Sequence, residues 1–391
     1  YENGPFRFNS TGDVVLNEFG WDVNAHTIFV DQPLGTGFSW TDDDRDDCAN
    51  EDCVSDDMVD FFQALFEARP ELRGKDVYVT GESYAGHYVP AVASKFFRVT
   101  QDFYERRARE DGTRNADETE TEAPVTYPIH LKGLAIGNGL TQPAVQYGAY
   151  ADFLLEHGKI SQGVHDAVEV AYPACRLALE ACASWQWTAA CEAAVGYCQL
   201  TVMAPLMAAA GNMNVYDVRL PCVGPLCYDF GAMSTYLSRA DVRQKLGVGD
   251  RAWQECSPEV HAQMMGDWGR RYDDLLPELL AADVRVLVYA GDQDFICNWL
   301  GNFRWLSQLD WPKREAWEQV PDLTWVSADR AAGLSRELGP LTFLKVYQAG
   351  HMVPMDQPKA ALDMITRFIN NKPFADVPGA RQPARYAVAA Q

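Results

Sequence analysis

The sequence predicts an α/β protein with a mainly parallel sheet, helices on both faces, and a helical insertion stapled by disulfides. One observation predicts the sheet: short β-branched and apolar runs alternate with longer segments of helical periodicity. A second predicts the insertion, because six cysteines gather between Cys175 and Cys227, at spacings of 7, 9, 7, 24 and 5, among Ala-rich amphipathic stretches. No internal repeat is visible.

The composition is that of a globular chain. Of 391 residues, 47% are hydrophobic and 23% charged, which excludes collagen, coiled coil and general disorder. Acids outnumber bases 55 to 33, and the net charge of −22 argues against nucleic acid and anionic membrane surfaces as partners. No apolar run reaches the roughly 18 residues of a membrane span, so none is expected. Nothing in the sequence sets the oligomeric state.

The expected elements follow in chain order. Strands are predicted at residues 27–30, 76–80, 130–136, 284–290 and 341–347. Helices are predicted at 58–68, 91–103 and 356–370. The acidic stretch 41–57 lacks calcium-loop spacing and is expected to be a solvated loop, as is the polar stretch 105–122. The predicted division is a sheet core of residues 1–141 and 273–372, a helical insertion of 142–272, and a loose tail of 373–391.

The cysteine pattern favours disulfides over zinc, because no C-x-x-C or H-E-x-x-H motif occurs. Cys48 and Cys53 bracket a short acidic loop and are a candidate bridge. Asn9 begins an N-S-T glycosylation sequon. These features predict an oxidising secretory route, no metal and no cofactor.

A candidate nucleophile follows the second predicted strand. From Gly81 the chain reads G-E-S-Y-A-G, and a nucleophile elbow needs small residues two before and two after the nucleophile. Gly81 and Ala85 meet this need around Ser83, and the N–H of Tyr84 would sit at a helix N-terminus, where it can stabilise an oxyanion. The alternative is a serine N-cap on an ordinary strand-to-helix turn.

Partners for Ser83 occur in the chain order Ser, Asp, His that α/β-hydrolases use. Asp292 and Asp294 follow the fourth predicted strand, at the sheet edge where the elbow also lies; either can be an ordinary turn carboxylate. His351 follows the last strand and suits a proton shuttle. His87 is a competitor, but an elbow aims its nucleophile away from the helix that carries this histidine.

Three motifs in this order resemble those of the serine carboxypeptidases: G-E-S-Y-A-G at 81–86, Y-A-G-D-Q-D-F-I-C-N at 289–298, and G-H-M-V-P-M-D-Q-P at 350–358. The match covers nearly the whole chain. The resemblance implies an α/β-hydrolase fold and release of C-terminal residues from peptides and proteins at acidic pH. It also implies that Ser83 is the nucleophile, His351 the base, and Asp294 rather than Asp292 the orienting acid.

By the same resemblance, Glu82 and Glu2 form a pair that binds the terminal carboxylate of the substrate. Two close carboxylates cannot both ionise cheaply, so one is expected to stay protonated and donate a hydrogen bond, best at acidic pH. The residues that match the family's apolar subsites are Leu140, Tyr147, Tyr150, Cys297 and Met352.

The resemblance also implies a disulfide pattern. The pairs are Cys175–Cys198, Cys182–Cys191 and Cys222–Cys227, in addition to the candidate Cys48–Cys53. Cys297 matches a free thiol, and Cys256 matches a cysteine whose partner lies in an upstream N-G-G-P-G-C-S-S segment. That segment also supplies a second oxyanion N–H, so the natural protein is expected to be longer and to carry its first strands upstream.

Two other functions share these features. An acyltransferase on the same scaffold would use the same Ser, Asp and His, and the Glu pair favours the peptidase. A non-catalytic protective or binding protein would keep the fold, and the intact Ser83, Asp294 and His351 set counts against it. The expected location is a vacuole-like or lysosome-like compartment, or the exterior.

Overall fold

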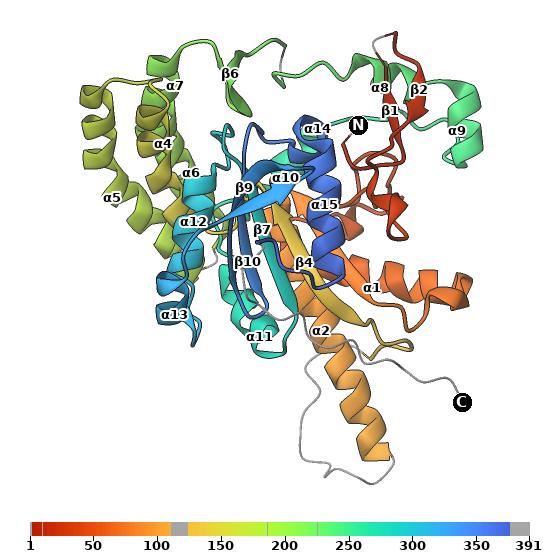
Figure 1. The fold of residues 1–391 in the computed structure, drawn as a ribbon. Coiled ribbons are helices and arrows are strands. Elements are labelled where there is room, and N and C mark those ends of the chain that lie inside the picture. Colours follow the sequence, from red (N-terminus) through yellow and green to blue (C-terminus); the bar gives the residue numbers. More distant parts are fainter. Residues whose placement is uncertain (1, 10, 111–123, 186, 225, 376–391) are drawn as a thin grey trace.

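A six-stranded sheet forms the centre of the molecule (Figure 1). The computed structural model describes residues 2–9, 11–110, 124–185, 187–224 and 226–375. The strands of this sheet are β3 (Val77–Glu82), β4 (Leu131–Gly137), β7 (Arg285–Gly291), β8 (Leu323–Ser327), β9 (Arg330–Leu338) and β10 (Leu341–Val346). Their order is β3-β4-β7-β10-β9-β8; the first four run parallel, whereas β9 pairs antiparallel with both of its neighbours, β10 and β8. The mainly parallel α/β architecture expected from the sequence is therefore present.

The two faces of the sheet pack against different helices. Val286 and Val288 of β7 lie in a cluster with α2 (Ala85–Glu110), α11 (Leu276–Ala281) and α12 (Trp299–Ser307). The intervening Leu287 and Tyr289 pack instead with α15 (Pro358–Ile369), on the opposite face (Figure 1). Successive strand side chains point to opposite faces, so a strand that is apolar and buried from Val286 to Ala290, as β7 is, must be covered on both.

The chain between β4 and β7 is mostly helical. Its helices are α3 (Pro143–Gln146), α4 (Tyr150–Glu156), α5 (Gln162–Trp185), α6 (Thr188–Cys198), α7 (Ala204–Ala210), α8 (Gly231–Leu237), α9 (Ala240–Leu246), α10 (Pro258–Gln263) and α11. Helices α4 to α7 share a core cluster of their own beside the sheet (Figure 1). The remaining described helices are α1 (Glu51–Ala68), α13 (Arg314–Gln319) and α14 (Val353–Asp356), and two small sheets pair β1 (Phe6–Phe8) with β2 (Val14–Leu16) and β5 (Met213–Asn214) with β6 (Asp217–Pro221).

Eight cysteines lie in the four pairs stated above. Cys175–Cys198 and Cys182–Cys191 join α5 to α6, and Cys48–Cys53 and Cys222–Cys227 close short loops. Cys256 is an exposed thiol and Cys297 a buried one. Cys48, Cys53 and Asp57 are near enough to share a metal ion, but the two cysteines are bonded to each other and have no thiolate to offer.

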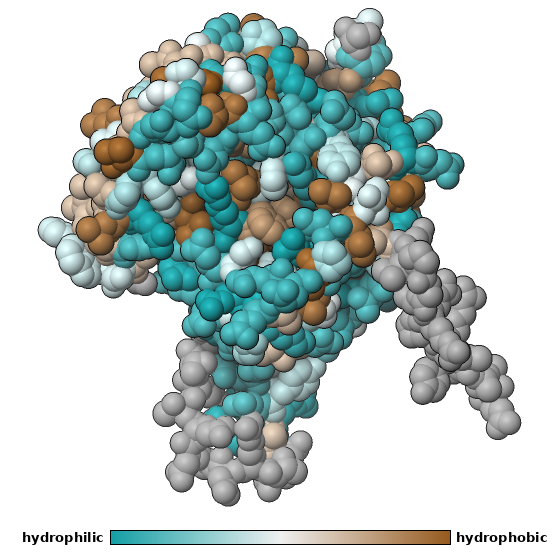
Figure 2. Space-filling model, turned by 60° about the vertical axis from the view of Figure 1, so that its left-hand side comes forward, coloured by the Kyte–Doolittle hydropathy of each residue, from teal (hydrophilic) through white to brown (hydrophobic). Residues whose placement is uncertain are grey.

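Helical residues 188–210 are long and apolar enough to cross a membrane, which the sequence did not lead us to expect. This segment carries Cys191 and Cys198, which are bonded to α5, and it buries Val202 and Leu206 completely. One third of its apolar window is buried, so one face of the segment packs in the core cluster of the helical region and the rest is exposed. The face of the molecule shown in Figure 2 is mostly hydrophilic, with apolar side chains in scattered groups.

Several predicted boundaries are wrong. Residues 27–30 form no strand: Ile28 and Phe29 are 48% and 61% exposed, and no described strand pairs with them. The predicted loop 41–57 ends early, because α1 begins at Glu51, where the Asn50 side chain accepts a hydrogen bond from Cys53 N–H and the first turn is acidic.

Other differences concern the ends of the chain and its polar stretches. Helix α2 continues to Glu110, through part of the expected surface excursion, and residues 111–123 lie outside the described chain. Phe374 and Ala375, expected to begin a loose tail, are buried, and residues 376–391 lie outside the described chain. The β8–β9 hairpin was not predicted.

Candidate functional site

The turn after β3 holds Ser83 in an unusual backbone conformation. Its φ is 66°, in the left-handed region that a residue other than glycine seldom occupies outside functional sites. A Cβ at Gly81 would lie 2.5 Å from Ala85 Cβ, so the small residues that the motif requires are the ones that let strand and helix approach. Ser83 N–H donates to the Gly137 carbonyl, and its own carbonyl accepts from Leu140 N–H. The end of β4 and the loop that follows it thus hold the Ser83 turn in place through these two hydrogen bonds.

His351 and Asp294 lie together at the same edge of the sheet. Nδ1 of His351 is 2.9 Å from Oδ2 of Asp294, and their side chains are 4% and 0% exposed. That same oxygen accepts from Asn138 Nδ2 at 2.8 Å and from Cys297 N–H at 3.2 Å. These contacts fix the carboxylate, which in turn fixes the tautomer with a proton on Nδ1 and leaves Nε2 free to accept one.

Ser83 follows β3 and His351 follows β10, so both lie at the carboxyl edge of the parallel strands. Within the described chain, no hydrogen bond joins Ser83 Oγ to the His351 ring. Such contacts are often long before substrate binds. Over the same residues, the backbone N–H of Tyr84 donates no hydrogen bond, so it is available to a developing oxyanion at the start of α2.

The two competing residues are placed elsewhere. His87 is completely buried, and its Nδ1 lies 2.5 Å from the Leu140 carbonyl oxygen; burial lowers the pKa of this histidine. Asp292 Oδ1 is buried without a partner among the described residues, and burial raises the pKa of that carboxyl. The structure therefore brings Asp294, and not Asp292, to His351.

Glu2 and Glu82 form a hydrogen-bonded pair of carboxyls next to the turn. Burial, and then the charge of Glu2, raise the pKa of Glu82 well above its usual value. Burial also raises the pKa of Glu2, against the opposing influence of His351. Asn17 fixes this segment by donating from Nδ2 to the carbonyls of Glu2 and Gly4. The pair therefore keeps at least one proton at acidic pH.

The residues expected to shape apolar subsites flank these loops. Leu140 follows the β4 loop, Cys297 follows Asp294, and Met352 adjoins His351. Tyr147 and Tyr150 pack edge to face with ring centroids 5.2 Å apart, and the Tyr150 hydroxyl donates to the Ile296 carbonyl. These five side chains are at most 9% exposed.

Sequence reasoning missed two residues of this site. Asn138, to which the sequence analysis gave no role, has a φ of 42° and donates from Nδ2 to Asp294. Its signal was available, because asparagine tolerates the left-handed region and followed a predicted strand. Tyr216, whose carbonyl accepts from His351 N–H at 2.7 Å, gave no such signal, because its role is carried by the backbone.

The sheet order, the strained serine turn and the Asp294–His351 pair together define an α/β-hydrolase fold with a serine, histidine and acid at its carboxyl edge. Residues 1–371 match the profile of the serine carboxypeptidase family. The chain belongs to that family.

Relatives support this assignment. A serine carboxypeptidase-like protein of Oryza sativa subsp. japonica is 43% identical over 94% of this chain and 80% of its own length. Serine carboxypeptidase 3 of Hordeum vulgare is 42% identical over 97% of this chain and 70% of its own length. The crystal structure of Kex1Δp, a prohormone-processing carboxypeptidase from Saccharomyces cerevisiae, aligns with a TM-score of 0.78 at 25% identity, covering 97% of this chain and 80% of that one. The family and the four disulfides point to a secretory or vacuolar route.

Proposed function

We propose that this protein is a serine-type carboxypeptidase that releases C-terminal residues from peptides at acidic pH. The observation that carries the proposal is the Glu2–Glu82 carboxyl pair beside Ser83. A protonated carboxyl of this pair can donate a hydrogen bond to a substrate carboxylate, so the pair selects the free end of a peptide. Family membership supports the same reaction class.

In this mechanism Ser83 Oγ attacks the carbonyl carbon of the last peptide bond while His351 Nε2 takes the hydroxyl proton. The N–H of Tyr84 stabilises the oxyanion. Collapse breaks the C–N bond, and His351 returns the proton to the departing amine, which leaves as a free amino acid. Water then hydrolyses the acyl-enzyme on Ser83 through the same base. Asp294 keeps the imidazole oriented throughout.

The acidic optimum follows from the carboxyl pair. A carboxyl whose pKa is raised is protonated, and able to donate, below that pKa; the donor is lost as the pH rises through it. A fully ionised pair would also repel the substrate carboxylate. Peptidase activity is therefore expected at low pH and is expected to decline as the pair ionises.

The test is active-site labelling of the purified protein with a fluorophosphonate, followed by peptide mapping. Labelling at Ser83, with loss of label and of peptide hydrolysis in Ser83→Ala, is expected. Labelling of a different serine would contradict the assignment. Adding an alcohol to the peptide reaction separates hydrolysis from acyl transfer, and an ester as the dominant product under dilute alcohol would favour the acyltransferase.

A further inference from the structure

The β5–β6 hairpin, residues 213–221, lies far in sequence from β7 and β10, the strands that precede Asp294 and His351. In space it contacts the loops that follow these two strands. It belongs to the chain between β4 and β7, which we propose as the helical insertion, and the Cys222–Cys227 disulfide closes the loop that follows it. No residue of this hairpin belongs to the proposed catalytic set. Its backbone, however, contacts both of the loops that carry the acid and the base.

On one side the hairpin holds the loop of Asp294. The Val215 carbonyl accepts from Phe295 N–H at 3.1 Å and from Ile296 N–H at 3.0 Å. Val218 N–H donates to the Gln293 carbonyl at 2.9 Å. These three hydrogen bonds bracket Asp294, which lies between Gln293 and Phe295. The position of the acid is thus set by the hairpin as well as by the end of β7.

On the other side the hairpin holds the loop of His351. Tyr216, the next residue after Val215, accepts from His351 N–H at 2.7 Å, and the two rings lie 5.1 Å apart. The approach is close, since a Cβ at Gly350 would lie 2.5 Å from the Tyr216 carbonyl oxygen. Two successive peptide carbonyls therefore accept from the acid loop and from the base loop, and so join the two loops through the hairpin.

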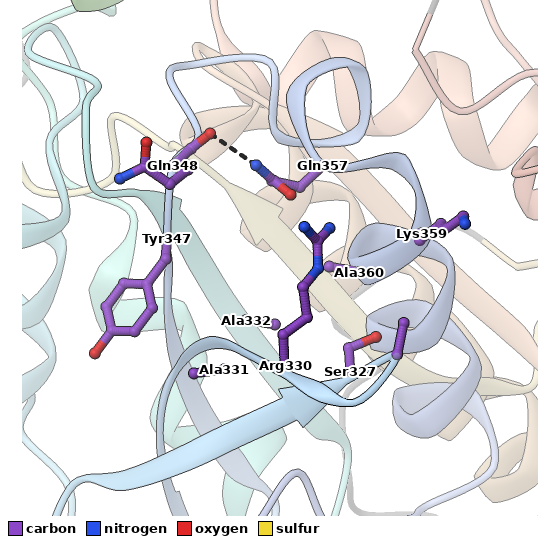
Figure 3. A pocket seen from close by; sticks show the side chains of 10 residues that line it. Ser327, Arg330, Ala331, Ala332, Tyr347, Gln348, Gln357, Lys359 and Ala360 are labelled. Atoms are coloured by element: carbon purple, nitrogen blue, oxygen red, sulfur yellow. Dashed lines mark hydrogen bonds between the residues drawn. The ribbon is translucent and has the colours of Figure 1, made fainter.

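Side chains brace the same contact. Asp217, which is 2% exposed, accepts from Arg219 Nε at 2.9 Å, and Arg219 also reaches Asp356 at 3.7 Å. Asp356 in turn accepts from Gly350 N–H at 2.6 Å. Farther along this loop, Gln357 Nε2 donates to the Gln348 carbonyl, at the edge of a surface cavity of about 80 Å³ (Figure 3). The His351 loop is therefore held at several points: the hairpin contacts both this loop and the Asp294 loop, and the two loops also bond directly, through Gln293 N–H and the Ala349 carbonyl at 2.9 Å.

One side chain fixes the hairpin itself. Asn214 is completely buried; its Oδ1 accepts from Tyr216 N–H at 2.8 Å, and its Nδ2 donates to the Cys227 carbonyl at 3.1 Å. It therefore ties the two carbonyl-bearing residues to the disulfide-closed loop. Only a short side chain with both an acceptor and a donor makes these two contacts together.

We propose that Asn214 is a positioning residue for the reaction, acting through the carbonyls of Val215 and Tyr216 to hold Asp294 and His351 in register. The proposal rests on the proposed function, because it assumes that these two residues serve Ser83. A displacement of about 1 Å in such a constellation costs on the order of a hundredfold in rate.

The experiment compares Asn214→Ala with Val223→Ala, which changes an exposed side chain in the adjacent Cys222–Cys227 loop. The time course of fluorophosphonate labelling at Ser83 gives two quantities: the fraction of molecules that label and the second-order rate constant of that fraction. The values of kcat and KM for a peptide are measured alongside. We expect Asn214→Ala to lower the labelling constant and kcat by about 10- to 100-fold, with KM changed less than about threefold. Val223→Ala is expected to match the wild type.

A second variant, Asn214→Asp, keeps the acceptor for Tyr216 N–H. A buried carboxyl has a raised pKa, so at low pH the new side chain is protonated and also donates to the Cys227 carbonyl. As the pH rises it ionises and that donor is lost. We therefore expect Asn214→Asp to approach wild-type labelling at acidic pH and to fall toward Asn214→Ala at neutral pH.

The outcomes separate the two proposals. If the wild type is not labelled at Ser83, the proposed function fails. If the wild type is labelled but Asn214→Ala reduces only the fraction of molecules that label, with an unchanged rate constant, Asn214 has a purely structural role and the inference is wrong. A pH profile of Asn214→Asp parallel to that of Asn214→Ala would overturn it as well.

Discussion

The carboxyl pair makes a sharp prediction for Glu82→Gln. The substituted side chain would keep a hydrogen bond to Glu2 by donating its amide N–H, and would remove the charge and the shared proton of the pair. In the wild type the hydrogen bond from Glu82 lowers the pKa of Glu2, while the charge of Glu2 raises the pKa of Glu82, so Glu2 ionises first and Glu82 keeps its proton. In the variant Glu2 is the one ionisable carboxyl of the pair. An ionised Glu2 repels the substrate carboxylate instead of binding it.

The size of the effect follows from the hydrogen bond that is lost. A hydrogen bond to a charged group contributes about 1.5–3 kcal/mol, and about 1.36 kcal/mol corresponds to a tenfold change in rate. We therefore expect kcat/KM for a peptide with a free C-terminus to fall roughly 10- to 160-fold at a pH of about 4.5. The matching ester, which has no free carboxylate, is expected to change less than about threefold, because Ser83, His351 and Asp294 are untouched.

The assay measures kcat/KM for a blocked dipeptide and for its ester analogue between about pH 4.5 and about pH 7.5. Peptide hydrolysis by the variant is expected to stay below that of the wild type across this range, because the variant lacks the proton that Glu82 retains after Glu2 ionises. Glu278→Gln is a matched control, since it makes the same chemical change on α11, where the partner of Glu278 is Arg98. Equal losses for peptide and ester in Glu82→Gln would refute the carboxylate-binding role.

Two further predictions concern stability. Burial and the charge of Asp267 raise the pKa of Glu51 well above its usual value. The contribution of Glu51 to the free energy of unfolding is therefore fully present below the unfolded pKa of about 4.3 and is lost as the pH rises through the folded pKa. Between the two pKa values the loss is about 1.4 kcal/mol for each pH unit. Glu51→Gln is therefore expected to raise Tm at about pH 7.5 and to change it little at about pH 4, and a gain at the lower pH alone would contradict this. Replacing both Cys175 and Cys198 by Ala, which opens a span of 23 residues, is expected to lower the free energy of unfolding by about 3 kcal/mol in denaturant titration. A loss below about 1 kcal/mol would contradict the loop-entropy estimate.

Strand and helix boundaries show where local pattern was sufficient. The runs that became β7 and β10 were placed within a residue at each end, because a strand buried on both faces is mostly apolar along its length. Residues 27–30 had the same composition but no described neighbour to pair with. β-propensity reports fit to a sheet, and only the fold supplies the sheet.

The serine turn could be predicted from the sequence because its conformation depends on neighbouring residues. Ser83 needs small neighbours within two residues, and the sequence shows them. The choice of Asp294 over Asp292 could not be made from turn chemistry, since both follow the same strand; it came from family resemblance, and the structure brings Asp294 to His351.

The sequence by itself determined the fold class, the motifs around the reactive residues and their order, and the cysteine-rich segment. Each of these is recognised from a short stretch of neighbouring residues or from the order of such stretches along the chain. The tertiary structure decided how Asp294 and His351 are held: by Asn138, 156 residues from Asp294, and by the backbone carbonyls of Val215 and Tyr216. A peptide carbonyl has the same chemistry in every residue, so the amino-acid sequence carries no mark of the ones that hold these two side chains.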